Sequence, residues 1–137
     1  MNSCLLQDVC PTTEWVPFNK KCYLFPDITA NAYDTLELCE NMSAKMVWID
    51  NDDVNDFLLT QMNGRGFDEI WIAANDKAVA NEWVWGPGDM VTNAVWGQWE
   101  PNNRWNEECV VLKPLWADVG CTRLSYPVCE VHFNISS

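Results

Sequence analysis

A short stretch from Gln98 to Val110 combines residue types that suit a metal ion. It reads Q-W-E-P-N-N-R-W-N-E-E-C-V and places Glu100, Asn102 and Glu107 close together in the chain. A solvated acidic loop has no need of the flanking tryptophans, and a core strand does not tolerate the carboxylates. Calcium takes 6–8 oxygen ligands, including carboxylates and amide carbonyls. The stretch is therefore interpreted as hard oxygen ligands held on a rigid frame.

The E-P-N triplet has the spacing needed to direct two side chains to one ion. Glu100 and Asn102 occupy alternate positions, so on an extended chain their side chains point the same way. Pro101 stiffens the link between them. Each side chain offers one suitable carbonyl-type oxygen, so the triplet suits a hard divalent cation.

Length and composition limit the classes of protein to consider. The 137 residues correspond to about one domain, and 48% of them are hydrophobic, enough for one core. No apolar run approaches the roughly 18 residues of a membrane span, so membrane insertion is not expected. The net charge of −12, with only eight basic residues, would repel nucleic acid. The acidic balance suits a divalent cation, and equally a soluble, self-repelling secreted protein.

Cysteine usage indicates an oxidising compartment. Seven cysteines in so short a chain favour disulfides, and the sequence is interpreted as secreted and extracellular. The glycosylation sequons at Asn41 and Asn134 give weak support and suggest a glycoprotein. Zinc is a poor alternative, because there is no C-x-x-C pair and His132, interpreted as a surface residue, is the only histidine.

The elements that must position the stretch begin with a hairpin and two helices. Residues 15–25 predict two short strands around a turn at Asn19 and Lys20. A helix is expected over 31–42, where the apolar face consists of Ala32, Leu36 and Cys39.

A short strand over 47–50 and a second helix over 52–62 come next. The acidic run over 51–56 is interpreted as the start of that helix and its solvated face, and Asn63 with Gly64 as its C-cap.

The second half of the chain is predicted to contain short strands and one long segment without a regular period. Strands are predicted over 70–73, 82–85, 109–112 and 126–131, whereas no period is visible over 86–108. A long irregular segment in a compact domain usually indicates a functional loop. The order of elements predicts an α+β domain.

Several segments of the chain fall in a familiar order and spacing. They are C-P-T-T-E-W-V-P-F-N-K-K-C-Y-L-F from Cys10, W-I-A-A-N-D from Trp71, W-V-W from Trp83, Trp96 ahead of E-P-N at Glu100, and a closing P-V-C-E that ends at Glu130. With them the chain resembles the C-type lectin-like domain family, in its long form, across nearly its whole length. The resemblance implies two helices flanking two small antiparallel sheets, with a long calcium- and ligand-binding loop.

The resemblance also implies a cysteine pairing, which the count of cysteines alone leaves open. The implied pairs are Cys10–Cys22, Cys39–Cys129 and Cys109–Cys121. Cys4 has no partner in this scheme, and we favour a disulfide-linked homodimer over a free thiol. The expected organisation is an N-terminal segment 1–9, a carbohydrate-recognition domain 10–131 and a tail 132–137.

Mannose-type members of the family hold calcium at this loop, and a sugar completes the coordination. The resemblance therefore makes Ca²⁺ the expected cofactor, implies a cis bond before Pro101 and adds Glu107 and Asp118 as further ligands. Two neighbouring equatorial hydroxyls of mannose-type glycans would bind the ion and contact the Glu100, Asn102 and Glu107 side chains. Trp99 and Trp105 flank the site, where they either stack on the sugar or pack as core. The remaining tryptophans are expected in the core: Trp71, Trp83, Trp85, Trp96 and Trp116.

The chain departs from the family pattern in two places. Ala117 stands where the family has asparagine, which leaves about five protein oxygens and predicts a calcium affinity weakened to about 10⁻⁴–10⁻³ M. The segment from Asn102 to Glu107 is also one residue shorter than usual. At the family's auxiliary calcium position Asp76 and Glu108 fit, but Ala80 replaces a carboxylate, so no second ion is predicted.

Three classes of function follow. The first is a calcium-dependent lectin in innate recognition or adhesion. The second is a calcium-independent protein-interaction module, for which Ala117 is the best support. The third is a glycosidase, which needs paired carboxylates across a cleft. Apart from the calcium ligands the sequence offers no such pair, so no enzyme is expected.

Overall fold

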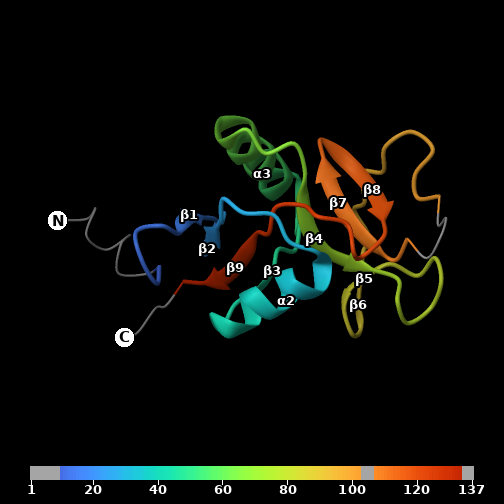
Figure 1. Ribbon diagram of the computed structural model, residues 1–137, viewed down its shortest axis with the longest axis horizontal. Coiled ribbons are helices and arrows are strands. Elements are labelled where there is room, and N and C mark those ends of the chain that lie inside the picture. The colour runs from blue at the N-terminus through green and yellow to red at the C-terminus, as the bar shows by residue number, and fades with distance from the viewer. Residues whose placement is uncertain (1–9, 103–106, 134–137) are drawn as a thin grey trace.

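The structure, a computed structural model, describes residues 10–102 and 107–133 (Figure 1). These residues form two helices and two antiparallel sheets, which confirms the predicted α+β class. The elements in chain order are β1 (Val16–Phe18), β2 (Lys21–Leu24), α2 (Ala32–Asn41), β3 (Lys45–Met46), α3 (Asp52–Arg65), β4 (Ile70–Asn75), β5 (Val84–Gly86), β6 (Asp89–Met90), β7 (Cys109–Lys113), β8 (Leu115–Val119) and β9 (Cys129–His132).

The first sheet has the order β1-β2-β9-β3 and joins the two ends of the chain. Asn19 and Lys20 form the β1–β2 turn with φ of 49° and 66°. Positive φ at both central residues is the mark of a tight hairpin turn, and asparagine tolerates it well. The predicted hairpin is confirmed. The last strand begins at Cys129 and not at 126, because Pro127 has no N–H to give to a ladder.

Helix α2 matches its predicted range, but its buried face differs from the prediction. Asn31 caps it by accepting a hydrogen bond from the Asp34 N–H at 2.8 Å. Its buried residues are Ala32, Thr35 and Cys39. Leu36 is 40% exposed, so its prediction as a core residue was wrong. The core side of the helix is centred on Thr35, which leaves Leu36 at its edge.

Helix α3 begins as predicted and ends later. Asn51 caps the helix through a 3.0 Å hydrogen bond from the Val54 N–H, with acidic residues in the first turn. The expected C-cap at Gly64 was wrong, because the helix continues to Arg65 and Gly66 adopts the left-handed conformation with φ of 74°. The next N–H, from Phe67, returns to the Met62 carbonyl at 3.0 Å. The cap is therefore placed where a buried phenylalanine can follow it.

The predicted strand over 47–50 is wrong, since the strand is Lys45–Met46. Beyond it the Val47 N–H donates to Val128 at 3.2 Å, while the Val47 carbonyl accepts from Ala73 at 2.9 Å. The N–H of Val47 therefore bonds on the side of the first sheet and its carbonyl on the side of the second, so the segment does not continue either sheet as a regular strand. The same segment ends at Asp50, whose carboxylate lies 2.6 Å from the Lys21 amine.

The second sheet has the order β6-β5-β4-β7-β8. Strand β4 lies at its centre and is buried along most of its length, as predicted. Strand β5 starts at Val84 and not at 82, because Trp83 pairs instead with the loop through a 3.0 Å hydrogen bond from Val91. Two strands were not predicted: β6 lies within the segment interpreted as irregular, and β8 follows β7 in a hairpin.

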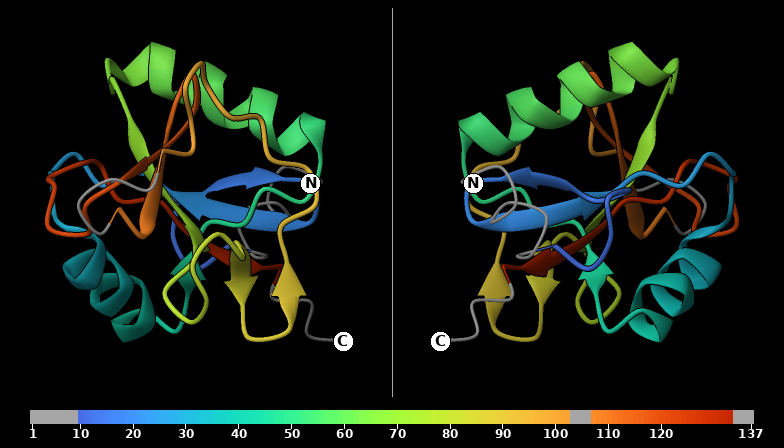
Figure 2. Two further views of the ribbon diagram at one scale, coloured as in Figure 1. Left: turned by 90° about the vertical axis from the view of Figure 1, so that its right-hand side faces the viewer. Right: turned by 90° about the vertical axis from the view of Figure 1, so that its left-hand side faces the viewer.

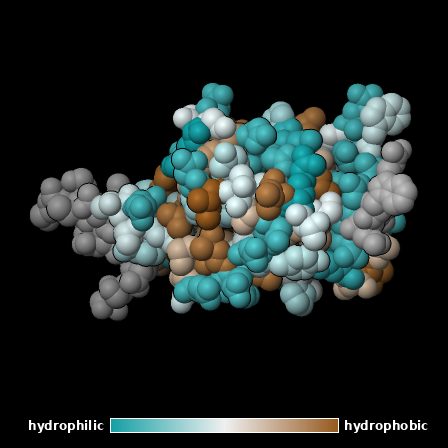
Figure 3. Space-filling view, viewed as in Figure 1, coloured by the Kyte–Doolittle hydropathy of each residue, from teal (hydrophilic) through white to brown (hydrophobic). Residues whose placement is uncertain are grey.

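The helices lie on opposite sides of the sheets, and the loop end lies far from the first sheet (Figures 1 and 2). The described residues contain the three disulfides that the resemblance implies, Cys10–Cys22, Cys39–Cys129 and Cys109–Cys121. Four of the five expected core tryptophans are buried, whereas Trp96 is half-buried against two of them. His132 is exposed, as expected. The loop end is mostly hydrophilic on the face in Figure 3.

Candidate functional site

Strand β8 anchors the segment that leads into the E-P-N triplet. The Trp116 N–H donates to Val95 at 2.8 Å, and the Trp116 carbonyl accepts from Gly97 at 2.8 Å. The Gly97 carbonyl in turn accepts from the Glu100 N–H at 3.0 Å. These bonds fix the approach to the triplet without a regular strand. The sequence analysis missed this anchoring, because it did not predict β8.

Glu100, Asn102 and Asp118 come together at the end of this segment. The Asn102 main-chain N–H donates to Asp118 Oδ1 at 3.0 Å, and the Asn102 side-chain amide donates to Glu100 Oε1 at 3.3 Å. The Glu100–Pro101 peptide bond is cis, as the resemblance implies. Asp118 is only 1% exposed, because β8 pairs it with Val110 in the core of the second sheet.

The electrostatics of the site are dominated by carboxyl groups. Burial, a side-chain hydrogen bond to Asp118 and the charge of Asp118 raise the pKa of Glu100 to about 7, and the charge of Glu107 adds to the effect. Near neutral pH, Glu100 is therefore protonated in about half of the molecules. A cation between these oxygens would replace the proton and relieve the repulsion.

The two flanking tryptophans differ in what the structure describes. Trp99 is 82% exposed and has φ of 68°, so of the two alternatives core packing is wrong for this residue, and its ring is available to a ligand. Trp105 lies outside the described residues. Glu107 is half-buried and precedes Cys109, whose disulfide to Cys121 closes the β7–β8 hairpin.

Two neighbouring positions offer less to a cation. The methyl group of Ala117 is 5% exposed and packs in the core beside the β7–β8 disulfide, so it adds no oxygen. Asp76 is buried and accepts a 2.8 Å hydrogen bond from the Asn81 N–H, which caps a turn at the auxiliary position. Its main-chain N–H donates to the Glu108 carbonyl at 3.2 Å. This arrangement gives Asp76 Oδ2 a structural role, whereas Asp76 Oδ1 is buried and has no hydrogen-bond partner among the described residues.

The donor set fits calcium in its chemistry. Among the described residues, no three histidine, cysteine, aspartate or glutamate side chains gather closely enough to hold a metal ion by themselves. The set at the loop is instead mixed: the carboxyl groups of Glu100 and Asp118 and the side-chain amide of Asn102. Hard oxygen ligands of this mixed kind are those that calcium takes.

The fold and this loop define a class of protein: an α+β binding domain whose site lies on a long irregular loop stabilised by disulfides. The family model "Lectin C-type domain" matches residues 28–131, and the chain belongs to this family. Members of the family are typically binding proteins without enzymatic activity, and they generally bind Ca²⁺ and carbohydrate.

Two relatives show how far the sequence similarity extends. The chain is 30% identical over 125 residues to mouse CD209 antigen-like protein C, covering 88% of this chain and 68% of the relative. It is 30% identical over 124 residues to human C-type lectin domain family 17, member A, covering 88% of this chain and 32% of the relative. The chain therefore spans only part of the length of such relatives.

Solved structures have the same fold. The carbohydrate-recognition domain of the mouse scavenger receptor C-type lectin has a TM-score of 0.84 and 27% identity, covering 93% of this chain and 100% of that one. The cow CD23 domain, solved in the presence of a GlcNAc2Man3 oligosaccharide, has a TM-score of 0.81 and 28% identity, covering 91% and 97%. A Ca²⁺-dependent type II antifreeze protein has a TM-score of 0.80 and 25% identity, covering 89% and 99%.

Within the described ranges, neither helix is long and apolar enough to cross a membrane.

Proposed function

We propose that this chain is a secreted, calcium-dependent lectin that binds mannose-type glycans and acts in innate recognition or adhesion. The observation that carries the proposal is the contact of Glu100, Asn102 and Asp118 at the loop. The cow CD23 domain, which was solved with a mannose-containing oligosaccharide, supports the ligand class. The domain is proposed to extend over residues 10–131.

The proposed site uses each group in a separate role. Glu100, Asn102, Glu107 and Asp118 would hold Ca²⁺, which supplies a Lewis-acidic centre for two neighbouring hydroxyls. Glu100 and Glu107 accept hydrogen bonds from those hydroxyls, and the Asn102 amide donates one. Trp99 would offer a flat apolar face to the ring carbons, and Trp105, which lies outside the described residues, is proposed to do the same. No bond is made or broken.

The test compares two aspartates that differ in position and not in charge. Asp118→Asn removes a buried carboxylate from the proposed site, whereas Asp27→Asn removes an exposed one elsewhere. We expect Asp118→Asn to lower calcium affinity at least about tenfold and to abolish retention on mannose-agarose in millimolar calcium. We expect Asp27→Asn to behave like the parent protein. Retention that survives both Asp118→Asn and a chelator would contradict the proposal.

A calcium-independent protein-interaction module is the second candidate. It is favoured by the buried methyl group of Ala117, where the resemblance expects an oxygen ligand. This candidate predicts that a chelator leaves binding intact. A glycan array probed with and without chelator separates the two, because only the lectin gives a mannose-type signal that the chelator removes.

Two further proposals concern assembly and modification. Cys4 lies outside the described residues, and we keep the disulfide-linked homodimer as a prediction. One sugar site binds weakly, so linked copies would raise avidity. Of the two sequons, Asn134 lies outside the described residues, while Asn41 is exposed at the end of α2 and is proposed to carry a glycan.

A further inference from the structure

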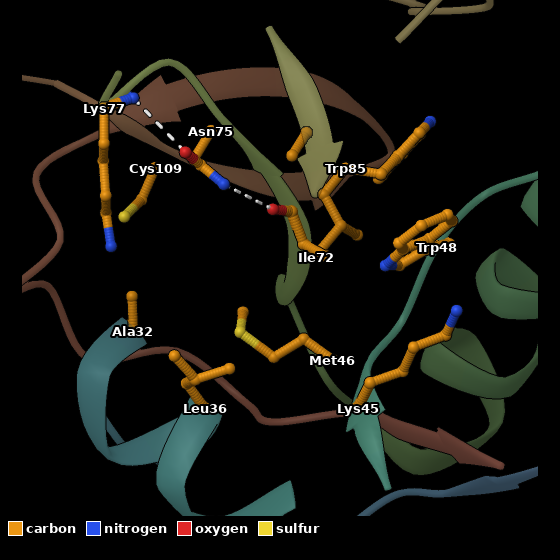
Figure 4. A pocket seen from close by; sticks show the side chains of 12 residues that line it. Ala32, Leu36, Lys45, Met46, Trp48, Ile72, Asn75, Lys77, Trp85 and Cys109 are labelled. Carbon is orange, nitrogen blue, oxygen red and sulfur yellow. Dashed lines mark hydrogen bonds between the residues drawn. The ribbon is translucent and has the colours of Figure 1, made fainter. Parts of the chain in front are cut away.

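A pocket of about 250 Å³ opens between α2 and β4, and none of the proposed calcium ligands lines it (Figure 4). We call it the α2–β4 pocket. Its apolar lining includes Ala32, Leu36, Met46, Ile72, Ala74 and Trp85. Ile72 and Ala74 are each 1% exposed and Leu36 is 40% exposed, so the pocket has a buried floor and an open rim. Its volume is just below the range of drug-sized sites, which suits a small ligand.

Two lysines stand on opposite sides of the rim (Figure 4). The Lys45 amine lies 3.6 Å from the Trp48 ring centroid, and the Lys77 amine lies 4.6 Å from that of Tyr33. In the part of the chain that the structure describes, neither amine forms an ion pair. The chain has only eight basic residues and a net charge of −12, yet two of those basic residues lie at one apolar opening. An exposed cation–π contact is weak enough to be exchanged for an anion.

The Asn75 side chain, a polar group in the pocket wall, already has hydrogen-bond partners within the protein. The Asn75 side-chain amide donates to the Ala73 carbonyl at 3.2 Å, and its oxygen accepts from the Lys77 N–H at 3.3 Å (Figure 4). A sugar or other polyol would therefore find few hydrogen-bond partners here. A ligand with one apolar end and one charged end would instead place the apolar end on the floor and the charge at the rim.

We propose that the α2–β4 pocket binds a small amphipathic anion. Its apolar ring or short chain contacts the floor formed by Met46, Ile72 and Trp85, and its carboxylate or sulfate pairs with Lys45 or Lys77. This binding uses none of the loop residues and needs no calcium.

The test is a titration of the full isotope-labelled chain followed by backbone amide NMR, in calcium and again in chelator. The probes are naphthoate, the uncharged naphthamide of the same shape, and acetate. We expect naphthoate to shift amides of the pocket saturably in both buffers, and to bind at least about threefold more tightly than naphthamide. Acetate should bind more weakly than either, and added salt should weaken naphthoate alone.

A matched pair of double variants isolates the lysines. Lys45→Gln with Lys77→Gln should weaken naphthoate at least about threefold and leave naphthamide unchanged. Lys20→Asn with Lys113→Gln removes the same charge from exposed positions outside the pocket and should change neither affinity. Asparagine suits position 20, where φ is 66°.

Three results would overturn the proposal: no saturable naphthoate shift in the pocket, shifts centred instead on the loop around Trp99, or equal affinity for naphthoate and naphthamide in the parent protein. A loss of affinity as large in the control pair as in the pocket pair would also overturn it, since it would show a general charge effect.

Discussion

Glu100 is the residue whose ionisation decides what the loop can hold. Its carboxyl group is hydrogen-bonded to Asp118, and burial together with that neighbour raises its pKa to about 7. In the proposed site a proton and a calcium ion would therefore compete for the same oxygens close to neutral pH. In the calcium-free protein the Glu100 carboxyl group is therefore partly protonated near neutral pH.

We predict that calcium affinity falls as the pH is lowered through about 7. Protonation of Glu100 removes one ligand charge, so the apparent dissociation constant should rise about tenfold for each pH unit well below that value. Calcium titrations at about pH 8 and about pH 5.5 measure the effect. Glu100→Gln should bind calcium more weakly at both values and lose most of the pH dependence; a variant that keeps the full dependence would contradict the assignment.

The same pKa affects the stability of the calcium-free protein. The folded chain keeps a proton on Glu100 that the unfolded chain releases near 4.5, so this group contributes stability that is lost as the pH rises from about 4.5 to about 7. Glu69 acts in the opposite sense: burial opposes its ionisation, but hydrogen bonds from Arg123 and Ser125 outweigh burial and hold its pKa below the ordinary value. The contribution of Glu100 is therefore measured as the difference in unfolding temperature between the parent and Glu100→Gln across this range.

Among the elements, α3 allows two glycines to be compared directly. Gly66 ends the helix with φ of 74°, whereas Gly64 lies inside it with open space where the methyl group of an alanine would project. Gly66→Ala should lower the free energy of unfolding by about 1–2 kcal/mol, because alanine is strained in the left-handed region. Gly64→Ala should raise it by about 0.5–1 kcal/mol. Urea unfolding of both variants measures the two effects, and equal effects at the two positions would show that the cap is misplaced.

The elements also show what the sequence could and could not predict. The hairpin around Asn19, the start of α3 and the strand β4 follow from local turn chemistry, capping and hydrophobicity. Strand β8 does not, because the buried carboxylate of Asp118 interrupts its apolar run. That same residue belongs to the candidate site, so the local rule fails at the position where a ligand is proposed to bind.

Beyond Glu100 and Asn102, the site was predictable only through the resemblance. Spacing alone brought Glu100 and Asn102 together, whereas Asp118 was added because the motif order matched the family. The contact between the Asn102 N–H and Asp118 depends on the pairing of Trp96 with Trp116, which brings distant segments together and leaves no local pattern.

For the whole molecule, the disulfides differ in the length of chain they close. Cys39–Cys129 spans a sequence separation of 90, whereas Cys10–Cys22 spans 12. Loop-closure entropy predicts that replacing the first pair by alanine lowers the free energy of unfolding by about 4.5 kcal/mol, and replacing the second by about 3 kcal/mol. Chemical unfolding of the two double variants tests this order. The reverse order would indicate that local packing outweighs the chain-entropy effect.

The first and last described strands lie in one sheet, at the end of the molecule away from the loop (Figure 1). The Phe133 N–H even donates to the Lys20 carbonyl at 3.0 Å, so the two ends of the described fold leave from the same region. A stalk, a partner domain or a solid support joined at either end would therefore leave the E-P-N loop facing outward. Copies fixed side by side would all present their loops in one direction, and the spacing of their stems would select which branched glycans they can bridge.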